Sequence, residues 1–421
     1  MSKQTLAIVG SGWGAFPLTQ SINLSRYNVK VISPSRTLQY TPLLASAACG
    51  LFDVRLAEEP IRRQHRTALQ YYKATAENVD LQRRVITCLP SVEDLSRAPE
   101  PFLVAYDKIV LAPGCEIQTF NTPGAKEHAL FLRTTNDARI LQQRFLQMLD
   151  AASLPGSTEE QQRDILHIRV VGGGAIGIEA TAELFDLWHE SMRHLYPHLD
   201  GKVQISIHDV APQLLTTFDQ SLSQYAMQRL KERKVEMKTS SHIERVEQDA
   251  IYTKEDGRLP FGMLLWATGN KASPLLEKLD VKKPEHGLPR ILTDKYLRVL
   301  RPDGTPVDSA FALGDAADVD GQSLPTLASV ALQKGEYLTN ELNKPEAEQL
   351  GQPYDYKSVP TLAYIGAHDG VIGGSSEARG ERAWLAWRSG SLAWTRSWRR
   401  KVMITISWLL VWLNGRDISR P

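Results

Sequence analysis

Residues 6–15 read LAIVGSGWGA, and this stretch decides the fold. A short apolar run enters a glycine-rich turn in which Gly10, Gly12 and Ala15 fit the G-x-G-x-x-G/A pattern that joins a parallel strand to a helix. The first glycine permits a tight turn, the second lets the backbone approach a pyrophosphate, and the third small residue lets the helix lie close to the strand. The helix N-terminus then faces the phosphates. The sequence therefore predicts a dinucleotide site at the start of the chain.

A second copy of the pattern begins 162 residues later. The apolar run at residues 168–171 enters GGGAIG, in which Gly172, Gly174 and Gly177 complete G-x-G-x-x-G. One such loop is also compatible with an ordinary strand-to-helix turn, but two loops in the same context favour two nucleotide sites. We expect an α/β protein with two Rossmann-like dinucleotide-binding domains, one for FAD and one for a nicotinamide cofactor.

Composition agrees with an ordinary folded protein of two or three domains. The chain has 421 residues, 42% of them hydrophobic, and a net charge of +1, which gives no reason to expect nucleic acid. Cys49, Cys88 and Cys115 form no C-x-x-C pair, so neither a disulfide framework nor a metal cluster is predicted, and a reducing compartment is favoured. His189, His194 and His198 lack nearby carboxylate or cysteine partners, so no metal site is expected there.

The ends of four strands supply further candidate residues. The strand at 27–32 ends at Ser33 instead of the usual Asp or Glu, so the first ribose must be held differently. The strand at 203–208 ends at Asp209, with no Arg at 210–215, which favours NADH over NADPH. The strand at 106–111 ends near Gly114 in a turn that suits close approach of a cofactor to the backbone, and a plain strand-end turn is the alternative. The strand at 261–267 ends near Gly269, which is a further expected cofactor contact. We also expect cofactor contacts at Arg36 and Pro42.

Other segments are assigned by periodicity. A hairpin is predicted at 69–89, and helices are predicted at 178–194 and 324–343. Regular structure is expected to be interrupted around 123–124 and 154–157. A further helical stretch is expected to include Glu58, Glu59 and Arg62. Gly314 and Asp315 are expected to start a helix whose amides and carboxylate hold the ribityl and phosphate part of a flavin. Glu179 is a candidate for the cofactor amide or ribose, and Glu183 is either a second one or a surface glutamate.

The tail differs in composition. Six of the nine tryptophans lie between Trp384 and Trp412, and residues 377–417 hold eight Lys or Arg against three Asp or Glu. On a single helix Trp384, Trp387, Trp394 and Trp398 would share an arc of about 80°, with arginines on another face. The apolar run at 402–413 is too short to span a bilayer. The pattern favours a segment lying in the membrane interface, and a helix packed on the core or a partner is the alternative.

The chain resembles the type II NADH:quinone oxidoreductases, the alternative NADH dehydrogenases, in their fungal and plant style. The resemblance covers nearly the whole sequence and is carried by five stretches: GSGWGA at 10–15, VISPSRTLQYTPLL at 31–44, VVGGGAIGIEATAEL at 170–184, LPTLASVALQKGEYL at 324–338 and WLNGRDISRP at 412–421. It implies an FAD domain at 1–120 and 285–345, interrupted by an NADH domain at 121–284. A membrane-anchoring region at 346–421 would follow, and a homodimer is expected.

The resemblance also implies the site residues. FAD contacts are expected at Gly10, Gly12, Gly14, Thr41 and Asp315, and NADH contacts at Gly172, Gly174, Gly177, Glu179 and Asp209. On the quinone-side helix the family has AQ-x-A-x-QE. Here Ser329 replaces the first Gln, Gln333 is kept, and Lys334 replaces Glu. Gln333 is therefore the first candidate for orienting the acceptor, with Ser329 and Lys334 beside it.

The expected activity is hydride transfer from NADH to FAD and then two-electron reduction of a quinone, without proton pumping. Because all three cysteines precede residue 116, a disulfide reductase or sulfide:quinone oxidoreductase is disfavoured. The alternatives are an apoptosis-inducing-factor-like NAD(P)H oxidoreductase acting on a non-respiratory quinone or metabolite, and a membrane-docked redox sensor. We expect a peripheral protein of the mitochondrial inner membrane in a eukaryote, with the cytoplasm as the alternative. Residues 1–5 run directly into the first strand and resemble no signal or transit sequence.

Overall fold

The computed structural model describes residues 3–62, 69–92, 100–374, 377–416 and 418. Asp417 and residues 419–421 of the closing motif lie outside these described residues. The chain forms two compact units, each built from three separate segments. Unit 1 comprises residues 1–39, 59–117 and 270–358, and unit 2 comprises residues 40–58, 118–269 and 359–421.

Unit 1 is organised around a large mixed sheet. Its strands, in the order in which they pair, are β21 (Ala317–Val319), β18 (Ile291–Thr293), β19 (Arg298–Leu300), β20 (Pro306–Ala312), β8 (Lys108–Leu111), β1 (Gln4–Val9), β2 (Tyr27–Ser33), β5 (Gln70–Asp80), β6 (Val85–Pro90) and β7 (Phe102–Ala105). The central strands β20, β8, β1, β2 and β5 pair in parallel. Residues 6–9 of β1 are buried, as expected for a parallel strand covered on both faces.

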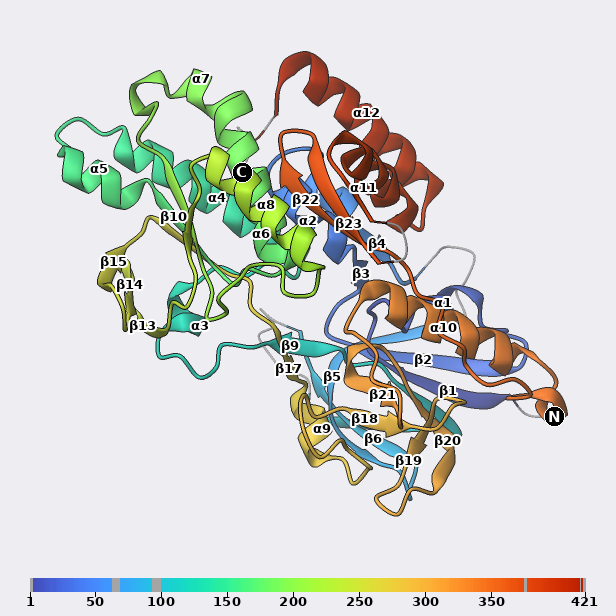
Figure 1. Ribbon diagram of the computed structural model, residues 1–421. Coiled ribbons are helices and arrows are strands. Elements are labelled where there is room, and N and C mark those ends of the chain that lie inside the picture. Colours follow the sequence, from blue (N-terminus) through green and yellow to red (C-terminus); the bar gives the residue numbers. More distant parts are fainter. Residues whose placement is uncertain (1–2, 63–68, 93–99, 375–376, 417, 419–421) are drawn as a thin grey trace. The chain divides into compact units, whose positions relative to one another are not determined.

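The antiparallel strands β5 and β6 confirm the predicted hairpin. The remaining elements of unit 1 are α1 (Phe16–Ser21), β3 (Thr37–Gln39), β9 (Cys115–Ile117), β17 (Asn270–Ala272), α9 (Pro274–Lys278), the 3-10 helices η5 (Gly314–Ala316) and η6 (Glu346–Glu348), and α10 (Ala328–Asn343). Helices α1 and α10 pack against each other (Figure 1). Gly335 permits this close packing, because a Cβ atom there would lie 2.2 Å from the carbonyl oxygen of Gly14.

Unit 2 contains a second parallel sheet. Its four strands pair in the order β12 (Glu236–Lys238), β11 (Gln204–His208), β10 (His167–Val171) and β16 (Met263–Trp266). All pairings are parallel, and every residue of β10 is buried. A three-stranded antiparallel sheet follows in the chain: β13 (Ile243–Val246), β14 (Ala250–Thr253) and β15 (Gly257–Pro260). The predicted α/β class is thus confirmed, with parallel strands at the centre of the main sheet of each unit.

The helices of unit 2 begin and end at recognisable signals. Capping boxes start α4 at Thr134 and α5 at Thr158, and Gly124 starts α3 with a left-handed backbone. The helices are η1 (Thr41–Leu43), α2 (Leu44–Ala48), η2 (Val54–Ala57), α3 (Ala125–His128), α4 (Thr135–Ala152), α5 (Glu159–Ile165), α6 (Ala175–Leu187), the π-helix η3 (Trp188–Met192), α7 (Arg193–Leu195), η4 (Pro197–Leu199) and α8 (Gln220–Glu232). The predicted breaks at 123–124 and 154–157 are confirmed.

The C-terminal region belongs to unit 2. It forms the small sheet β22 (Thr361–Gly366), β23 (Asp369–Gly373) and β24 (Ala378–Arg379), followed by α11 (Glu381–Trp394) and α12 (Trp398–Asn414). Helix α11 packs on β22 and β23, and α6 packs on β22 (Figure 1). Among the described residues no helix is long and apolar enough to cross a membrane.

Of four expectations about local structure, two are wrong and two are right only in part. The tail is two helices, separated at residues 395–397, so its tryptophans do not form one stripe: Trp387 is buried while Trp398 is exposed. Glu58–Pro60 form strand β4 instead of a helix. Gly314 and Asp315 start a three-residue 3-10 helix that leads into β21. The helix expected at 324–343 begins only at Ala328, after the non-helical residues around Pro325.

Candidate functional site

The two glycine loops have the same geometry. Gly10 and Gly172 adopt φ values of 105° and 109°, which favour glycine. A Cβ atom on either would lie 2.1 Å or 2.5 Å from a carbonyl oxygen, that of Ala112 or Ala267 respectively. Each first glycine is therefore required for close approach of the neighbouring parallel strand. At the third position, Ala15 is buried in unit 1, and a Cβ atom on Gly177 would lie 1.9 Å from the oxygen of Gly172.

The second glycines differ from the first in what surrounds them. A Cβ atom on Gly12 or Gly174 would meet nothing within 4 Å. Both residues are exposed, and each lies at the carboxyl end of a central strand next to the start of a helix. These are the two positions at which the pattern brings a pyrophosphate against the backbone. The protein leaves space at both, so the residues fit two bound dinucleotides.

The residue at the end of the second strand contacts its glycine loop in both units. In unit 1 the hydroxyls of Ser33 and Ser11 are 2.9 Å apart. In unit 2 the carboxylate of Asp209 accepts a hydrogen bond from the backbone N–H of Gly173 at 2.5 Å and from that of Ala211 at 2.7 Å. Asp209 therefore puts a negative charge beside the loop, whereas Ser33 puts a neutral hydroxyl there.

Further predicted FAD residues of unit 1 lie at strand ends and on turns. Asp315 is partly exposed in η5, and the thiol of Cys115 donates a hydrogen bond to it at 3.3 Å. Gly314 adopts φ of 74° beside Ala331 of α10, and Gly114 adopts φ of 73° with open space around it. Gly14 is close to Leu313, whose side chain a Cβ atom there would meet at 2.2 Å. Arg36 is exposed after β2.

Three predicted cofactor residues lie in short turns of unit 2. Thr41 and Pro42 form the first turn of η1, and Gly269 follows β16 with open space around it. The backbone of Gly269 accepts a hydrogen bond from Gln118 N–H at 3.0 Å. Thr41 and Pro42 thus belong to unit 2, while the FAD glycine loop belongs to unit 1.

Glu179 lies in α6, two residues beyond Gly177. Its Oε1 accepts hydrogen bonds from the indole Nε1 of Trp387 at 3.0 Å and from the backbone N–H of Tyr364 at 3.3 Å. Burial raises the pKa of this carboxyl group to about 8, although both hydrogen bonds oppose the shift. A carboxyl group with a raised pKa therefore lies in the helix that follows the second glycine loop.

The three predicted acceptor residues lie on α10. The side-chain amide of Gln333 makes two hydrogen bonds of 3.0 Å with the backbone of Lys357, and Ser329 is partly exposed one turn earlier. Lys334 has a side chain that is 1% exposed, with Nζ 3.1 Å from the carbonyl oxygen of Ala317 and 3.9 Å from Asp318. Burial lowers the pKa of Lys334 to about 8. Its present contacts tie α10 to β21.

The comparisons with known proteins identify the chain. The family described as pyridine nucleotide-disulphide oxidoreductase matches residues 4–335. An internal alternative NAD(P)H-ubiquinone oxidoreductase A1 of mitochondria from Solanum tuberosum is 32% identical over 99% of this chain and 88% of its own length. The chain belongs to the type II NADH dehydrogenases. A probable NADH dehydrogenase from Dictyostelium discoideum is 31% identical over 100% of this chain and 92% of its own length.

A solved structure gives the same fold for this type II NADH dehydrogenase. The NDH2 structure from Plasmodium falciparum in complex with NADH superposes with a TM-score of 0.90 at 23% identity, covering 99% of this chain and all of that one. The family membership accounts for two nucleotide loops in one chain, and FAD and NADH are the cofactors of this type II NADH dehydrogenase.

The sequence did not reveal that residues of the C-terminal region are bonded to helix α6. Glu183 is fully buried and pairs with Arg416, whose guanidinium donates to it at 2.8 Å and to the carbonyl oxygen of Cys49 at 3.2 Å. The expectation of a surface glutamate at Glu183 is therefore wrong, and a cofactor contact there stays a prediction. The sequence held one signal for this ion pair. Several acidic residues lie on the apolar helix α6, and an acidic side chain needs a partner once it is buried.

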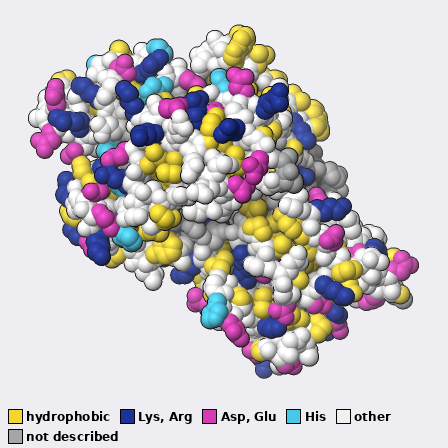
Figure 2. Space-filling model, viewed as in Figure 1, with side chains coloured by type: hydrophobic (Ala, Val, Ile, Leu, Met, Phe, Trp, Pro, Cys, Tyr) yellow, Lys and Arg dark blue, Asp and Glu magenta, His cyan; other side chains and the backbone are white. Residues whose placement is uncertain are grey.

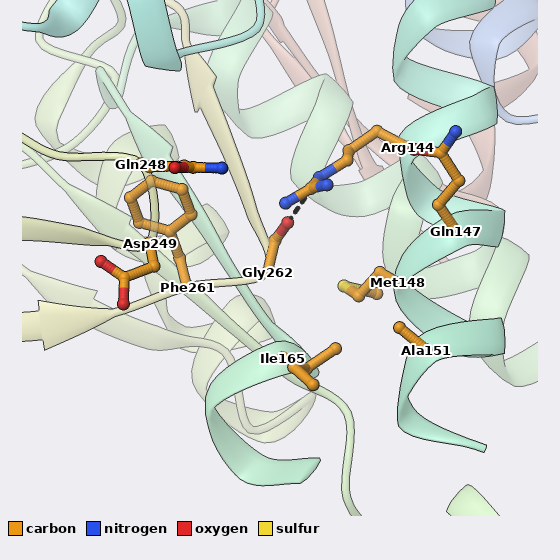
Figure 3. A pocket seen from close by; sticks show the side chains of 9 residues that line it. All are labelled: Arg144, Gln147, Met148, Ala151, Ile165, Gln248, Asp249, Phe261 and Gly262. Atoms are coloured by element: carbon orange, nitrogen blue, oxygen red, sulfur yellow. Dashed lines mark hydrogen bonds between the residues drawn. The ribbon is translucent and has the colours of Figure 1, made fainter. Parts of the chain in front are cut away.

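The described residues also form a pocket away from the nucleotide loops. It has a volume of about 480 Å³ and lies in unit 2, between α4, α5 and the chain that enters β16 (Figure 3). Arg144 reaches across it and donates a hydrogen bond to the carbonyl oxygen of Gly262 at 2.7 Å. None of the predicted site residues of the type II NADH dehydrogenase lines this pocket. No metal-binding group of three or more side chains occurs among the described residues.

Proposed function

We propose that this chain passes a hydride from NADH to FAD and then two electrons to a quinone, without proton pumping. The observation that carries the proposal is the paired geometry of the glycine loops at Gly10 and Gly172, each with open space at its second glycine. The name of the Solanum tuberosum relative supports a ubiquinone as acceptor. When bound, FAD supplies the chemistry, since it accepts two electrons as hydride and returns them to a quinone.

For FAD, the loop at 10–15 would take the pyrophosphate, with Gly12 in contact and α1 directed at it. Ser33 would offer a hydroxyl to the ribose in place of a carboxylate. Gly114, Gly314 and Asp315 would accommodate the ribityl and ring end, and Arg36, Thr41 and Pro42 are proposed as further contacts. The roles of these residues rest on their positions at strand ends and turns.

For NADH, Gly174 and the start of α6 would take the pyrophosphate, and Asp209 would accept the ribose hydroxyls. A 2'-phosphate would meet the carboxylate of Asp209 and be repelled, so we propose a preference for NADH. Glu179 would hydrogen-bond the carboxamide at the nicotinamide end. These residues bind and orient the nucleotide and need not take a covalent part in the reaction.

For the acceptor, Gln333 and Ser329 are proposed to orient the quinone. The side-chain amide of Gln333 is held by two hydrogen bonds with the backbone of Lys357, so its orientation on α10 is fixed. Lys334 is proposed mainly as a support, because a buried ammonium group between Ala317 and Asp318 fixes α10 relative to β21. That support would keep Ser329 and Gln333 in register.

The experiment is a steady-state assay of the purified protein with NADH and a soluble ubiquinone analogue. We expect turnover with the quinone to exceed turnover with oxygen alone by at least about tenfold, and NADH to be used in preference to NADPH. Equal rates with oxygen alone, or no turnover, would favour an apoptosis-inducing-factor-like oxidoreductase or a redox sensor and would contradict the proposal.

We further propose that the exposed face of α12 lies on a membrane surface, that of the mitochondrial inner membrane in a eukaryotic cell. Eight large hydrophobic side chains of this helix are exposed: Trp398, Val402, Met403, Ile406, Leu409, Leu410, Trp412 and Leu413. Figure 2 shows hydrophobic side chains on the surface of this part of the molecule. Arg399 and Lys401 are exposed beside them, as is typical of a helix lying in an anionic interface. The homodimer stays a prediction from the resemblance.

Membrane docking is tested by point substitutions, because deletion of the tail would also remove Trp387 and Arg416 from the core of unit 2. Leu409→Glu combined with Leu413→Glu should lower binding to phosphatidylcholine vesicles containing cardiolipin by at least about tenfold, since each leucine contributes about 1.5–3 kcal/mol when buried. Leu154→Glu, at an exposed leucine in the loop after α4, is the control and should leave vesicle binding, measured by flotation, unchanged. A change from dimer to monomer in the double variant without lipid would show instead that a second copy covers this face.

A further inference from the structure

Helix α6 carries a row of acidic side chains, and each one is bonded to another part of unit 2. Glu179 binds Trp387, Glu183 binds Arg416, and Asp186 accepts a hydrogen bond of 2.6 Å from the hydroxyl of Tyr364. Asp186 also pairs with Arg233 of the segment that follows α8. Because α6 begins at the second glycine loop, the C-terminal region contacts the helix on which the nicotinamide cofactor is expected to bind.

The indole of Trp387 is fixed in two ways. Its ring stacks on Tyr364 with a centroid separation of 4.8 Å and an interplanar angle of 17°, and the two side chains form a small core with Ala182 of α6. Its Nε1 donates to Oε1 of Glu179 at 3.0 Å. The stack holds the ring plane, so the N–H group is already aimed at the carboxylate.

The carboxylate of Glu179 is bound through one of its two oxygens. Both hydrogen bonds, from Trp387 and from the backbone of Tyr364, reach Oε1. In the described part of the chain Oε2 has no hydrogen-bond partner, and the side chain is partly exposed. A carboxylate accepts several hydrogen bonds. One oxygen is therefore anchored, and the other is free to accept a hydrogen bond from a ligand.

We propose that Trp387 is a positioning residue of the nicotinamide site. By holding Oε1 of Glu179, it orients Oε2 to accept a hydrogen bond from the carboxamide N–H of the bound nucleotide. The inference rests on the proposed function, because it assumes that this loop binds NADH. It makes α11, a helix of the C-terminal region, part of the machinery that binds the nicotinamide nucleotide.

The charge state of Glu179 supports this assignment. Burial and the neighbouring carboxylate of Glu183 raise its pKa, while the N–H groups of Trp387 and Tyr364 lower it, with a result of about 8. Burial raises the pKa of Glu183 itself, and Asp186 adds to that shift, whereas Arg416 and Arg388 oppose it. Loss of the indole N–H removes a bond to the ionised form of Glu179, so its pKa should rise further and less carboxylate should be present at pH 7.

The test is Trp387→Phe in the full-length protein with FAD bound, because phenylalanine keeps the ring stack on Tyr364 and removes the N–H donor. Anaerobic flavin reduction by NADH is followed by stopped flow over a range of pH. We expect the second-order rate constant for flavin reduction by NADH at pH 7 to fall about tenfold, and the inflection in its pH profile to move up by about one pH unit. The loss should therefore largely disappear at alkaline pH, whereas the rate of flavin reoxidation by quinone should not change.

Trp384→Phe is the matched control. Trp384 lies one turn earlier on α11 and has its ring against His368, so its loss should leave the pH profile unchanged. In a Glu179→Gln background, Trp387→Phe should have no further effect on the profile. If the wild type reduces its flavin with NADH and Trp387→Phe keeps the wild-type profile, or loses activity equally at all pH values, the inference is overturned and the proposed function stands. If the wild type does not react with NADH, the proposed function fails first.

Discussion

Arg416→Ala is expected to lower the melting temperature of the protein by roughly 5 °C, equivalent to a loss of about 3–5 kcal/mol. The guanidinium of Arg416 donates to Glu183 at 2.8 Å, to Glu190 at 3.1 Å and to the carbonyl oxygen of Cys49. The side chains of Arg416 and Glu183 are 4% and 1% exposed. Removal of the arginine would leave a carboxylate buried without its counter-charge, which is costly.

Arg399→Ala is the control, because Arg399 is exposed on α12 and its loss should change the melting temperature little. A second comparison separates the pair from the surrounding packing. Adding Glu183→Leu to Arg416→Met should recover part of the lost stability, since it removes the unpaired charge. If Arg416→Ala has the same melting temperature as the wild type, this ion pair does not hold the C-terminal segment.

Gly174→Val should weaken NADH binding by at least about a hundredfold while the flavin stays bound. A Cβ atom at Gly174 would meet no protein atom within 4 Å, and the residue has φ of −74°, which any L-residue adopts. The valine side chain would therefore occupy only the space in which the pyrophosphate is proposed to lie. Titration of the purified variant with NADH, followed through flavin absorption, measures the effect.

Gly12→Val is the matching change in the other loop and should give the opposite pattern. It too meets no protein atom within 4 Å, so the variant should fold but purify with little FAD. Together the two substitutions distinguish the two nucleotide sites. Wild-type NADH affinity in Gly174→Val, or a full complement of FAD in Gly12→Val, would show that the assignment of that loop is wrong.

The glycine loops could be predicted from sequence because their chemistry is local. Each loop needs a positive φ at its first glycine and open space at its second, and both requirements are expressed within six consecutive residues. The end of each second strand could be located for the same reason, so Ser33 and Asp209 were placed correctly at strand ends.

The contacts of the C-terminal region could not be predicted in this way. Trp387 and Glu179 are 208 residues apart in the chain, and Arg416 and Glu183 are 233 apart. The periodicity of a helix shows which side chains share a face, but it does not show what covers that face. Trp387 was therefore grouped with exposed tryptophans such as Trp398, although it is buried against Tyr364.

Lys334 illustrates a third limit. Its place in a family motif suggested a role toward the acceptor, yet its ammonium group is buried against Ala317 and Asp318. A motif predicts the position of a residue on a helix. The direction of its side chain depends on the rotamer and on the surrounding charges, which the motif does not give. The role of Lys334 toward the acceptor stays a prediction.

The central claim is that one chain binds FAD and NADH so that electrons pass from one to the other. The most direct test is an anaerobic titration of the purified wild-type protein with NADH, followed by its visible absorption. We expect about one FAD per chain, loss of the flavin absorption with about one equivalent of NADH, and its return on addition of a ubiquinone analogue. A colourless protein that takes up no added FAD, or a flavin that NADH leaves oxidised, would contradict it.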